Sequence, residues 1–215
     1  MATITLHSAV TYHTACRQLC RQHAVFAHIH QLYGPPPQWQ RPPGLATLVR
    51  IILEQQVSLQ AAAAHYQRLL AHVQGQLSPQ SLLSLSPGQW RACQVSQPKS
   101  RYLQHLAQAV QQGLLTLEQL PHLPDEEVQR QLCQIKGIGP WTANVYLMFA
   151  LQRADCFAPG DVALLRTLRQ LLPGMAKATP QQLLACTLPW QPWRTVAAFY
   201  LWWYYLCSRG RTLPF

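Results

Sequence analysis

The chain has 215 residues, with 17 Lys or Arg against 7 Asp or Glu, which gives a net charge of +10 at pH 7. Hydrophobic residues make up 49% of it, so the composition is that of a folded domain with a sizeable core and excludes a disordered tail. No stretch of about 18 uninterrupted apolar residues is present, and we expect no membrane span. A compact basic domain attracts polyanions, of which nucleic acid is one.

Proline and glycine divide the sequence into segments with the helical spacing of apolar residues, and there are no clear period-two strands joined by Asn-Gly or Asp-Gly turns. In chain order the predicted helices cover residues 7–20, 23–33, 45–57, 58–73, short stretches after Ser78-Pro79 and Ser86-Pro87, then 100–112, 125–134, 141–151, a segment that begins after Asp161, and 193–207. We therefore expect an all-α fold.

The seven cysteines form an odd set, and the first residues, Met-Ala-Thr-Ile-Thr, have neither the basic nor the apolar stretch of a secretory signal. We expect reduced thiols and a cytoplasmic location. Four side chains that could bind a metal fall at helical spacing near the N-terminus: His13, Cys16, Cys20 and His23. Such a stripe is more often a packing and surface feature than a zinc site, so we predict no metal there.

Between two predicted helices lies the sequence Lys136-Gly137-Ile138-Gly139-Pro140. Its two glycines allow a sharp backbone turn, Ile138 can fill the gap between the helices, and Pro140 suits the first position of the second helix. The amide groups at that helix N-terminus, together with the helix dipole, favour the binding of a phosphate. An ordinary helix–helix turn is the alternative, but the position between two clear helices favours a phosphate-binding hairpin.

The chain offers only seven carboxylates for any catalytic role: Glu54, Glu118, Asp125, Glu126, Glu127, Asp155 and Asp161. Asp161 follows Pro159-Gly160 and precedes an apolar helix, so the local sequence favours a helix N-cap. A carboxylate fixed at a helix start can also stabilise positive charge that develops in a reaction. Asp155 lies in a predicted loop beside Arg153 and is the weaker candidate.

Four segments together resemble the helix-hairpin-helix DNA glycosylase superfamily, and most of all its DNA-3-methyladenine glycosylase II branch. They are Glu54-Gln55-Gln56-Val57-Ser58, Pro98-Lys99-Ser100-Arg101-Tyr102-Leu103, Gly137-Ile138-Gly139-Pro140-Trp141-Thr142-Ala143-Asn144 followed by Asp161, and Trp190-Gln191-Pro192-Trp193-Arg194. The resemblance extends over residues 45–203. It implies one glycosylase domain over residues 1–215, made of two helical subdomains with an active-site cleft between them and the hairpin near residues 125–151.

The resemblance implies a monofunctional DNA glycosylase of base excision repair, which hydrolyses the N-glycosidic bond of alkylated purines such as 3-methyladenine and 7-methylguanine. Asp161 matches the catalytic aspartate of the family, and its charge would stabilise the cation that develops on the deoxyribose. Bifunctional relatives have a Schiff-base lysine in the hairpin where this sequence has Trp141. We therefore expect base removal without lyase activity.

An enzyme that acts on a base in a duplex must flip that base into a pocket. Alkylation of a ring nitrogen makes a purine cationic, and an electron-rich aromatic face binds such a cation. Trp141 and Trp202 match pocket tryptophans of the family, and Tyr146 is a further candidate, with core packing as the alternative for each. For Trp193 and Phe199 we favour core packing.

The resemblance also implies contacts with double-stranded DNA that contains a damaged base. The predicted DNA-binding residues are Gln55, Gln56, Ser58, Lys136, Gly137, Ile138, Gly139, Thr142 and Arg194. In the family, the turn at residues 55–58 inserts a side chain into the gap left by the flipped base. The matching position here is Gln56, which is polar where some members have an aliphatic residue, and Val162 stands where some relatives are aromatic. Both departures leave the preferred lesion open.

No cofactor is expected, although the hairpin leaves room for a monovalent cation, and we expect a monomer. Relatives with an iron–sulfur cluster have four closely spaced cysteines near the C-terminus, whereas only Cys186 and Cys207 lie there in this chain. Two alternatives stay open: a glycosylase for another lesion, such as uracil, hypoxanthine or an oxidised purine, and a non-catalytic helix-hairpin-helix DNA-binding module. The module would need neither Asp161 nor the two tryptophans, so these residues favour an enzyme.

Overall fold

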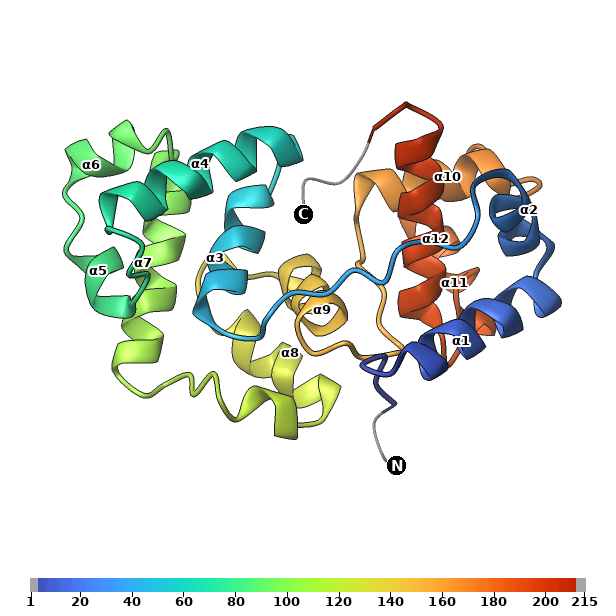
Figure 1. Ribbon diagram of the computed structural model, residues 1–215, viewed down its shortest axis with the longest axis horizontal. Coiled ribbons are helices and arrows are strands. Elements are labelled where there is room, and N and C mark those ends of the chain that lie inside the picture. Colours follow the sequence, from blue (N-terminus) through green and yellow to red (C-terminus); the bar gives the residue numbers. More distant parts are fainter. Residues whose placement is uncertain (1–3, 212–215) are drawn as a thin grey trace. The chain divides into compact units, whose positions relative to one another are not determined.

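The computed structural model describes residues 4–211 (Figure 1). In that range every regular element is a helix, apart from a single antiparallel bridge between Thr5 and Arg153. The chain divides into two compact units. Unit 1 consists of the described residues up to Gln40 and from Leu147 onward, and unit 2 runs from Arg41 to Tyr146. The predicted all-α fold is confirmed.

Unit 1 is built around one apolar helix near the C-terminus. Its elements are α1 (Ala9–Gln22), α2 (Ala24–Tyr33), α10 (Val162–Leu171), α11 (Pro180–Ala185), the 3-10 turn η2 (Leu188–Trp190) and α12 (Arg194–Cys207). α12 packs against α1, α2 and α10 (Figure 1). Residues 195–201 of α12 are buried without interruption, so this stretch has no polar face and forms the core of the unit.

Unit 2 gathers its helices around α3 and α7. Its elements are α3 (Leu45–Glu54), α4 (Leu59–His72), α5 (Pro79–Leu83), α6 (Pro87–Ala92), α7 (Gln97–Gln111), the 3-10 turn η1 (Leu120–His122), α8 (Asp125–Cys133) and the first part of α9 (Pro140–Phe149), within which the border between the units falls. α3 packs against α4 and α7, and α5 and α6 also pack against α7. The fully buried side chains of Leu48, Ile51 and Ile52 give α3 its apolar face.

Polar side chains at helix starts explain many of the boundaries. The residues whose side chains accept a first-turn backbone N–H are Ser8, Ser58, Ser78, Ser86, Asp161 and Thr179. The predicted helices are present, with ends shifted by a few residues. α3 ends at Glu54 rather than at residue 57 because Gln56 has a positive φ of 56°. α11 is absent from the sequence-based prediction, although the Thr179 and Gln182 capping box is a signal for it.

Two members of the cysteine and histidine stripe, Cys16 and Cys20, contribute to packing from α1, whereas His13 is exposed. Cys16 is buried, and burial raises the pKa of its thiol to about 11. Cys20 Sγ lies 3.4 Å from the Tyr200 hydroxyl, which is also hydrogen-bonded to His30 Nδ1 at 2.8 Å. Among residues 4–211, no group of three or more His, Cys, Asp or Glu side chains is arranged to hold a metal ion. No helix in the described part of the chain is both long and apolar enough to cross a membrane.

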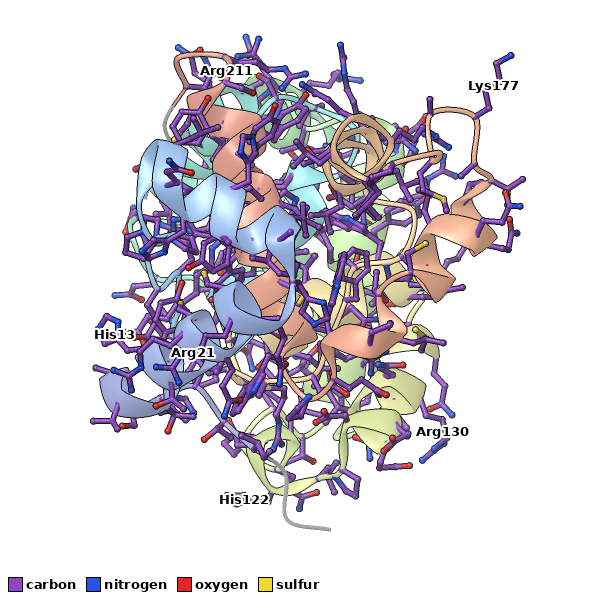
Figure 2. All side chains as sticks on the ribbon, turned by 90° about the vertical axis from the view of Figure 1, so that its right-hand side faces the viewer. His13, Arg21, His122, Arg130, Lys177 and Arg211 are labelled. Carbon is purple, nitrogen blue, oxygen red and sulfur yellow. The ribbon has the colours of Figure 1, made fainter. Side chains whose placement is uncertain are left out.

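Each unit carries exposed cationic side chains. In unit 1 Arg21 and Lys177 are exposed, and Lys177 extends away from the ribbon on the loop before α11 (Figure 2). In unit 2 Lys136 is exposed, whereas the exposed Arg130 pairs with Glu127 at 2.6 Å, which offsets its charge. Positive charge that faces solvent in this way attracts polyanions.

Thr195, in the first turn of α12, ties this helix to the segment that leads to Asp161. Its hydroxyl donates to the Arg153 carbonyl and accepts from the Cys156 N–H at 3.1 Å, and all three of these residues are buried. Thr195→Val keeps the shape of the side chain but removes both hydrogen bonds. We expect it to lower the free energy of unfolding by about 3 kcal/mol, measured by urea denaturation.

Thr195→Ser is the matched control, because it keeps the hydroxyl and removes one methyl group, which costs about 1 kcal/mol. A valine variant that is as stable as the serine variant would show that the hydroxyl does not have the assigned role.

Candidate active site

The hairpin joins α8 to α9 through a turn that requires glycine at one position. Gly137 has a φ of +99°, and a Cβ built there would lie 2.1 Å from Cγ of Tyr102 on α7. Ile138 is buried, with 4% of its surface exposed. A Cβ built on Gly139 would meet nothing within 4 Å. The protein therefore needs glycine at Gly137 for its own packing, whereas the backbone at Gly139 has open space beside it.

The side chain of Gln55, at the end of α3, is bonded to this hairpin. Gln55 Nε2 donates to the Gly137 carbonyl at 3.0 Å and to Thr142 Oγ1 at 2.9 Å. Thr142 is 1% exposed. Two of the predicted DNA contacts, Gln55 and Thr142, are thus engaged with each other inside unit 2, whereas Lys136 and Gln56 are exposed.

The turn that follows Gln55 carries Gln56, the residue predicted to fill the gap left by a flipped base and called the plug residue below. Gln56 is exposed and has a φ of 56°, which is uncommon for a residue with a side chain. Ser58 accepts the Ala61 N–H at 3.2 Å and so caps α4. Through Gln55, the turn at residues 55–58 is connected to the hairpin within unit 2.

Asp161 is held by N–H groups from two helices. Its Oδ1 accepts the Leu164 backbone N–H at 2.9 Å, which caps α10, and Trp202 Nε1–H from α12 at 3.1 Å. The side chain stays partly exposed. The predicted N-cap role is confirmed, and it coexists with a fixed carboxylate. A cap needs only the first bond, whereas the second bond also fixes the orientation of the carboxylate.

Trp202 is itself positioned by an aromatic cluster in unit 1. Its ring centroid lies 5.6 Å from that of Phe149 and 6.2 Å from that of Phe199, and both phenylalanines are buried. Contacts of this kind hold the indole in place. The sequence predicts Trp202 only as a pocket wall, so its role as a donor to Asp161 is an addition from the structure. Trp141, in unit 2, is partly exposed.

The segment at residues 190–194 binds Asp155. Arg194 Nε and Nη2 donate to the Asp155 carboxylate at 2.7 and 2.9 Å, and Gln191 Nε2 donates to it at 3.0 Å. Bidentate pairing of this kind is strong and directional, so Asp155 has a structural role. The Arg194 guanidinium is committed to Asp155, and this geometry does not support the predicted DNA contact of Arg194. Trp193, expected in the core, is partly exposed and donates through Nε1 to Gln18 Oε1.

Tyr146 is not placed to contact a base. Its side chain is fully buried, and its hydroxyl accepts the Gly44 N–H at 3.0 Å. Burial raises the pKa of Tyr146, although the bond from Gly44 opposes the shift. Residues 142–149 of α9 are all buried, so spacing along this helix could not distinguish a core position from a pocket position. Core packing, the alternative that the sequence left open, describes Tyr146.

Gly137→Ala and Gly139→Ala form a matched pair of variants. Alanine at Gly137 meets the Tyr102 ring in a left-handed backbone conformation, and we expect the free energy of unfolding to fall by about 2 kcal/mol or more. Alanine at Gly139 meets open space, and we expect a change within about 0.5 kcal/mol. Thermal and urea unfolding of both variants measure the difference. A larger loss in Gly139→Ala than in Gly137→Ala would be inconsistent with this hairpin geometry.

The region that contains these residues matches known proteins. A family model described as HhH-GPD superfamily base excision DNA repair protein matches residues 49–192. The DNA-3-methyladenine glycosylase 1 of Schizosaccharomyces pombe is 32% identical over 173 residues, which are 79% of this chain and 76% of that protein. The chain spans 39% to 56% of the length of three other curated relatives that it matches.

Two solved structures are similar over most of the chain. The crystal structure of DNA-3-methyladenine glycosidase from Bacillus halodurans has a TM-score of 0.76 and 31% identity, and the match covers 98% of this chain and 95% of that one. The Schizosaccharomyces pombe 3-methyladenine DNA glycosylase Mag1, in complex with abasic DNA, has a TM-score of 0.80 and 30% identity, with 88% and 95% covered. These matches confirm the predicted family, and this chain belongs to the HhH-GPD superfamily of base excision DNA repair proteins.

Proposed function

We propose that this protein is a DNA glycosylase that excises alkylated purines, such as 3-methyladenine and 7-methylguanine, from double-stranded DNA in base excision repair. The observation that carries the proposal is the Asp161 carboxylate, which Leu164 N–H and Trp202 Nε1–H hold in a fixed orientation. Relatives named as 3-methyladenine glycosylases support the substrate class. A module that only binds DNA would need the helix cap but not the second bond, from Trp202, which orients the carboxylate.

The proposed chemistry is hydrolysis assisted by a fixed negative charge. As the N-glycosidic bond breaks, its electron pair leaves with the base, and positive charge develops on the deoxyribose. The Asp161 carboxylate stabilises this charge more in the transition state than in the neutral sugar of the ground state, which lowers the barrier. Water then attacks C1′ and loses a proton to the solvent, so the products are the free base and an abasic site. A cationic alkylated purine leaves as a neutral base and needs no acid to protonate it.

The proposed reaction ends at the abasic site. A lyase step needs an amine that attacks C1′ and forms a Schiff base. α9 contains no lysine, and Trp141 is its second residue. We therefore propose base removal without strand cleavage, by a cytoplasmic monomer that uses no bound cofactor.

DNA recognition is proposed to combine the hairpin with an aromatic side chain. The open space beside Gly139 lets a phosphate oxygen approach the backbone at the start of α9, and the exposed Lys136 adds positive charge there. The ring of Trp202, in the same unit as Asp161, is the proposed partner of the cationic base.

Asp161→Asn tests the catalytic role without removing the helix cap. Asparagine is a good N-cap and keeps an acceptor oxygen for Leu164 and Trp202, but it is neutral. We expect the rate of 7-methylguanine release from duplex DNA to fall at least about 100-fold, with DNA affinity and thermal stability unchanged. Single-turnover release of the base, fluorescence anisotropy and thermal unfolding measure the three properties. Full activity in this variant would exclude Asp161 as the catalytic carboxylate.

Trp202→Phe tests the second donor. It keeps an aromatic ring but removes the N–H that binds Asp161, and a hydrogen bond to a charged group contributes about 1.5–3 kcal/mol. We expect the rate of base release to fall about tenfold or more while DNA affinity changes little. Trp203→Phe is the control, because Trp203 Nε1 donates to the Tyr33 carbonyl instead. If both variants lost the same factor in rate, the hydrogen bond from Trp202 to Asp161 would not have the proposed role.

A further inference from the structure

The side chain of Gln55 connects two parts of unit 2 for which different contacts with DNA are predicted. One part is the turn at residues 55–58, which carries the exposed Gln56, and the other is the hairpin. Gln55 Nε2 donates to the Gly137 carbonyl at 3.0 Å and to Thr142 Oγ1 at 2.9 Å. Because Gly137 lies in the turn of the hairpin and Thr142 in the first turn of α9, a single amide fixes both parts of the hairpin to the end of α3.

The C-terminal end of α3 is itself held in place by two buried cationic side chains. Lys99 Nζ donates to the Leu53 carbonyl at 2.6 Å, and Lys99 is only 9% exposed. Glu54 pairs with Arg41 at 2.7 Å, and Arg41 is buried. A cation at a helix C-terminus interacts favourably with the helix dipole, which adds to the effect of the Lys99 bond. The base of the turn is therefore fixed by buried charged groups, and Gln55 connects the hairpin to a rigid element.

Gln56 has a backbone conformation that neighbouring contacts must maintain. Its φ of 56° lies in the left-handed region, which costs about 1–3 kcal/mol for a residue with a side chain. Gln55 holds one side of the turn through the hairpin, and Ser58 holds the other as the cap of α4. A turn fixed on both sides presents the Gln56 side chain at a constant spacing from the hairpin.

We infer that Gln55 is a positioning residue that sets the spacing between the plug residue Gln56 and the phosphate-binding hairpin. Binding of the strand by the hairpin and filling of the gap left by a flipped base then occur together. This inference rests on the proposed function and on the gap-filling role that the family resemblance implies for Gln56. Direct contact of Gln55 with DNA is disfavoured, because Nε2 is used inside the protein and Oε1 carries a partial negative charge that a phosphate repels.

The test compares Gln55→Met with Gln60→Met. Methionine has a similar length to glutamine but no amide, and Gln60 is an exposed glutamine in the first turn of α4. Fluorescence anisotropy gives the affinity of each variant for two duplexes that differ only by one abasic-site analogue. We expect the wild type and Gln60→Met to prefer the abasic duplex, and Gln55→Met to lose at least about fivefold of that preference.

The ratio of the two affinities separates positioning from general weakening. If Gln55 only supported the fold, both duplexes would bind less well by the same factor and the preference would be unchanged, which would overturn the inference. A wild type with no preference for the abasic duplex would overturn it as well.

Thr142→Val provides a milder change at the other end of the same contact. It removes one acceptor of Gln55 but keeps the shape of the side chain, and we expect the preference to fall about two- to threefold. Because both variants break one contact, the double variant should be little worse than Gln55→Met alone. If the loss of preference in the double variant equalled the product of the two single losses, the two residues would not share one contact.

A parallel base-release assay separates this inference from the proposed function. If the wild type releases no alkylated base but Gln55→Met still loses the abasic preference, the positioning role stands and the proposed function fails. If the wild type releases 7-methylguanine and Gln55→Met keeps the preference, the proposed function stands and the positioning role fails.

Discussion

The hydrogen bond from Trp202 Nε1 to the Asp161 carboxylate is the interaction on which the proposed chemistry depends. It links the start of α10 to α12, the buried helix at the centre of unit 1. The apolar core of that unit therefore also determines how the carboxylate is oriented. A fixed charge needs no reorganisation as the reaction proceeds, which is the physical basis of electrostatic catalysis. Thr195 extends the same constraint to the start of α12 through its buried bonds to Arg153 and Cys156.

The same principle applies in unit 2 to the elements proposed to recognise DNA. An N–H group from one helix fixes a functional element of another, with Gln55 as the donor and the hairpin as the acceptor. The glycine at Gly137 permits the close approach of Tyr102, while Gly139 leaves the backbone open. In both units the element proposed to contact DNA is partly exposed, and the groups that position it are buried or committed to other protein atoms. Preorganisation of this kind lowers the entropy that binding must otherwise overcome.

The sequence predicts well the features that depend on neighbouring residues. The glycine turn at residues 137–139, between two clear helices, predicts the hairpin, and the Pro-Gly-Asp run predicts Asp161 as a helix cap. Contacts between distant residues lie beyond such patterns: Trp202 is 41 positions from Asp161, and Arg194 is 39 from Asp155. For Tyr146 the sequence leaves a pocket role and core packing open. Its spacing cannot decide between them, because residues 142–149 of α9 are all buried and the helix lacks a distinguishing apolar stripe.

The wild-type reaction on a duplex with one 7-methylguanine tests the central claim most directly. Single-turnover samples are divided, one half analysed for free base and the other for strand cleavage with and without alkali. We predict stoichiometric release of 7-methylguanine and a strand that stays intact until alkali cleaves the abasic site. Retention of the base on DNA that the protein binds, or a cleaved strand without alkali, would contradict a monofunctional glycosylase centred on Asp161.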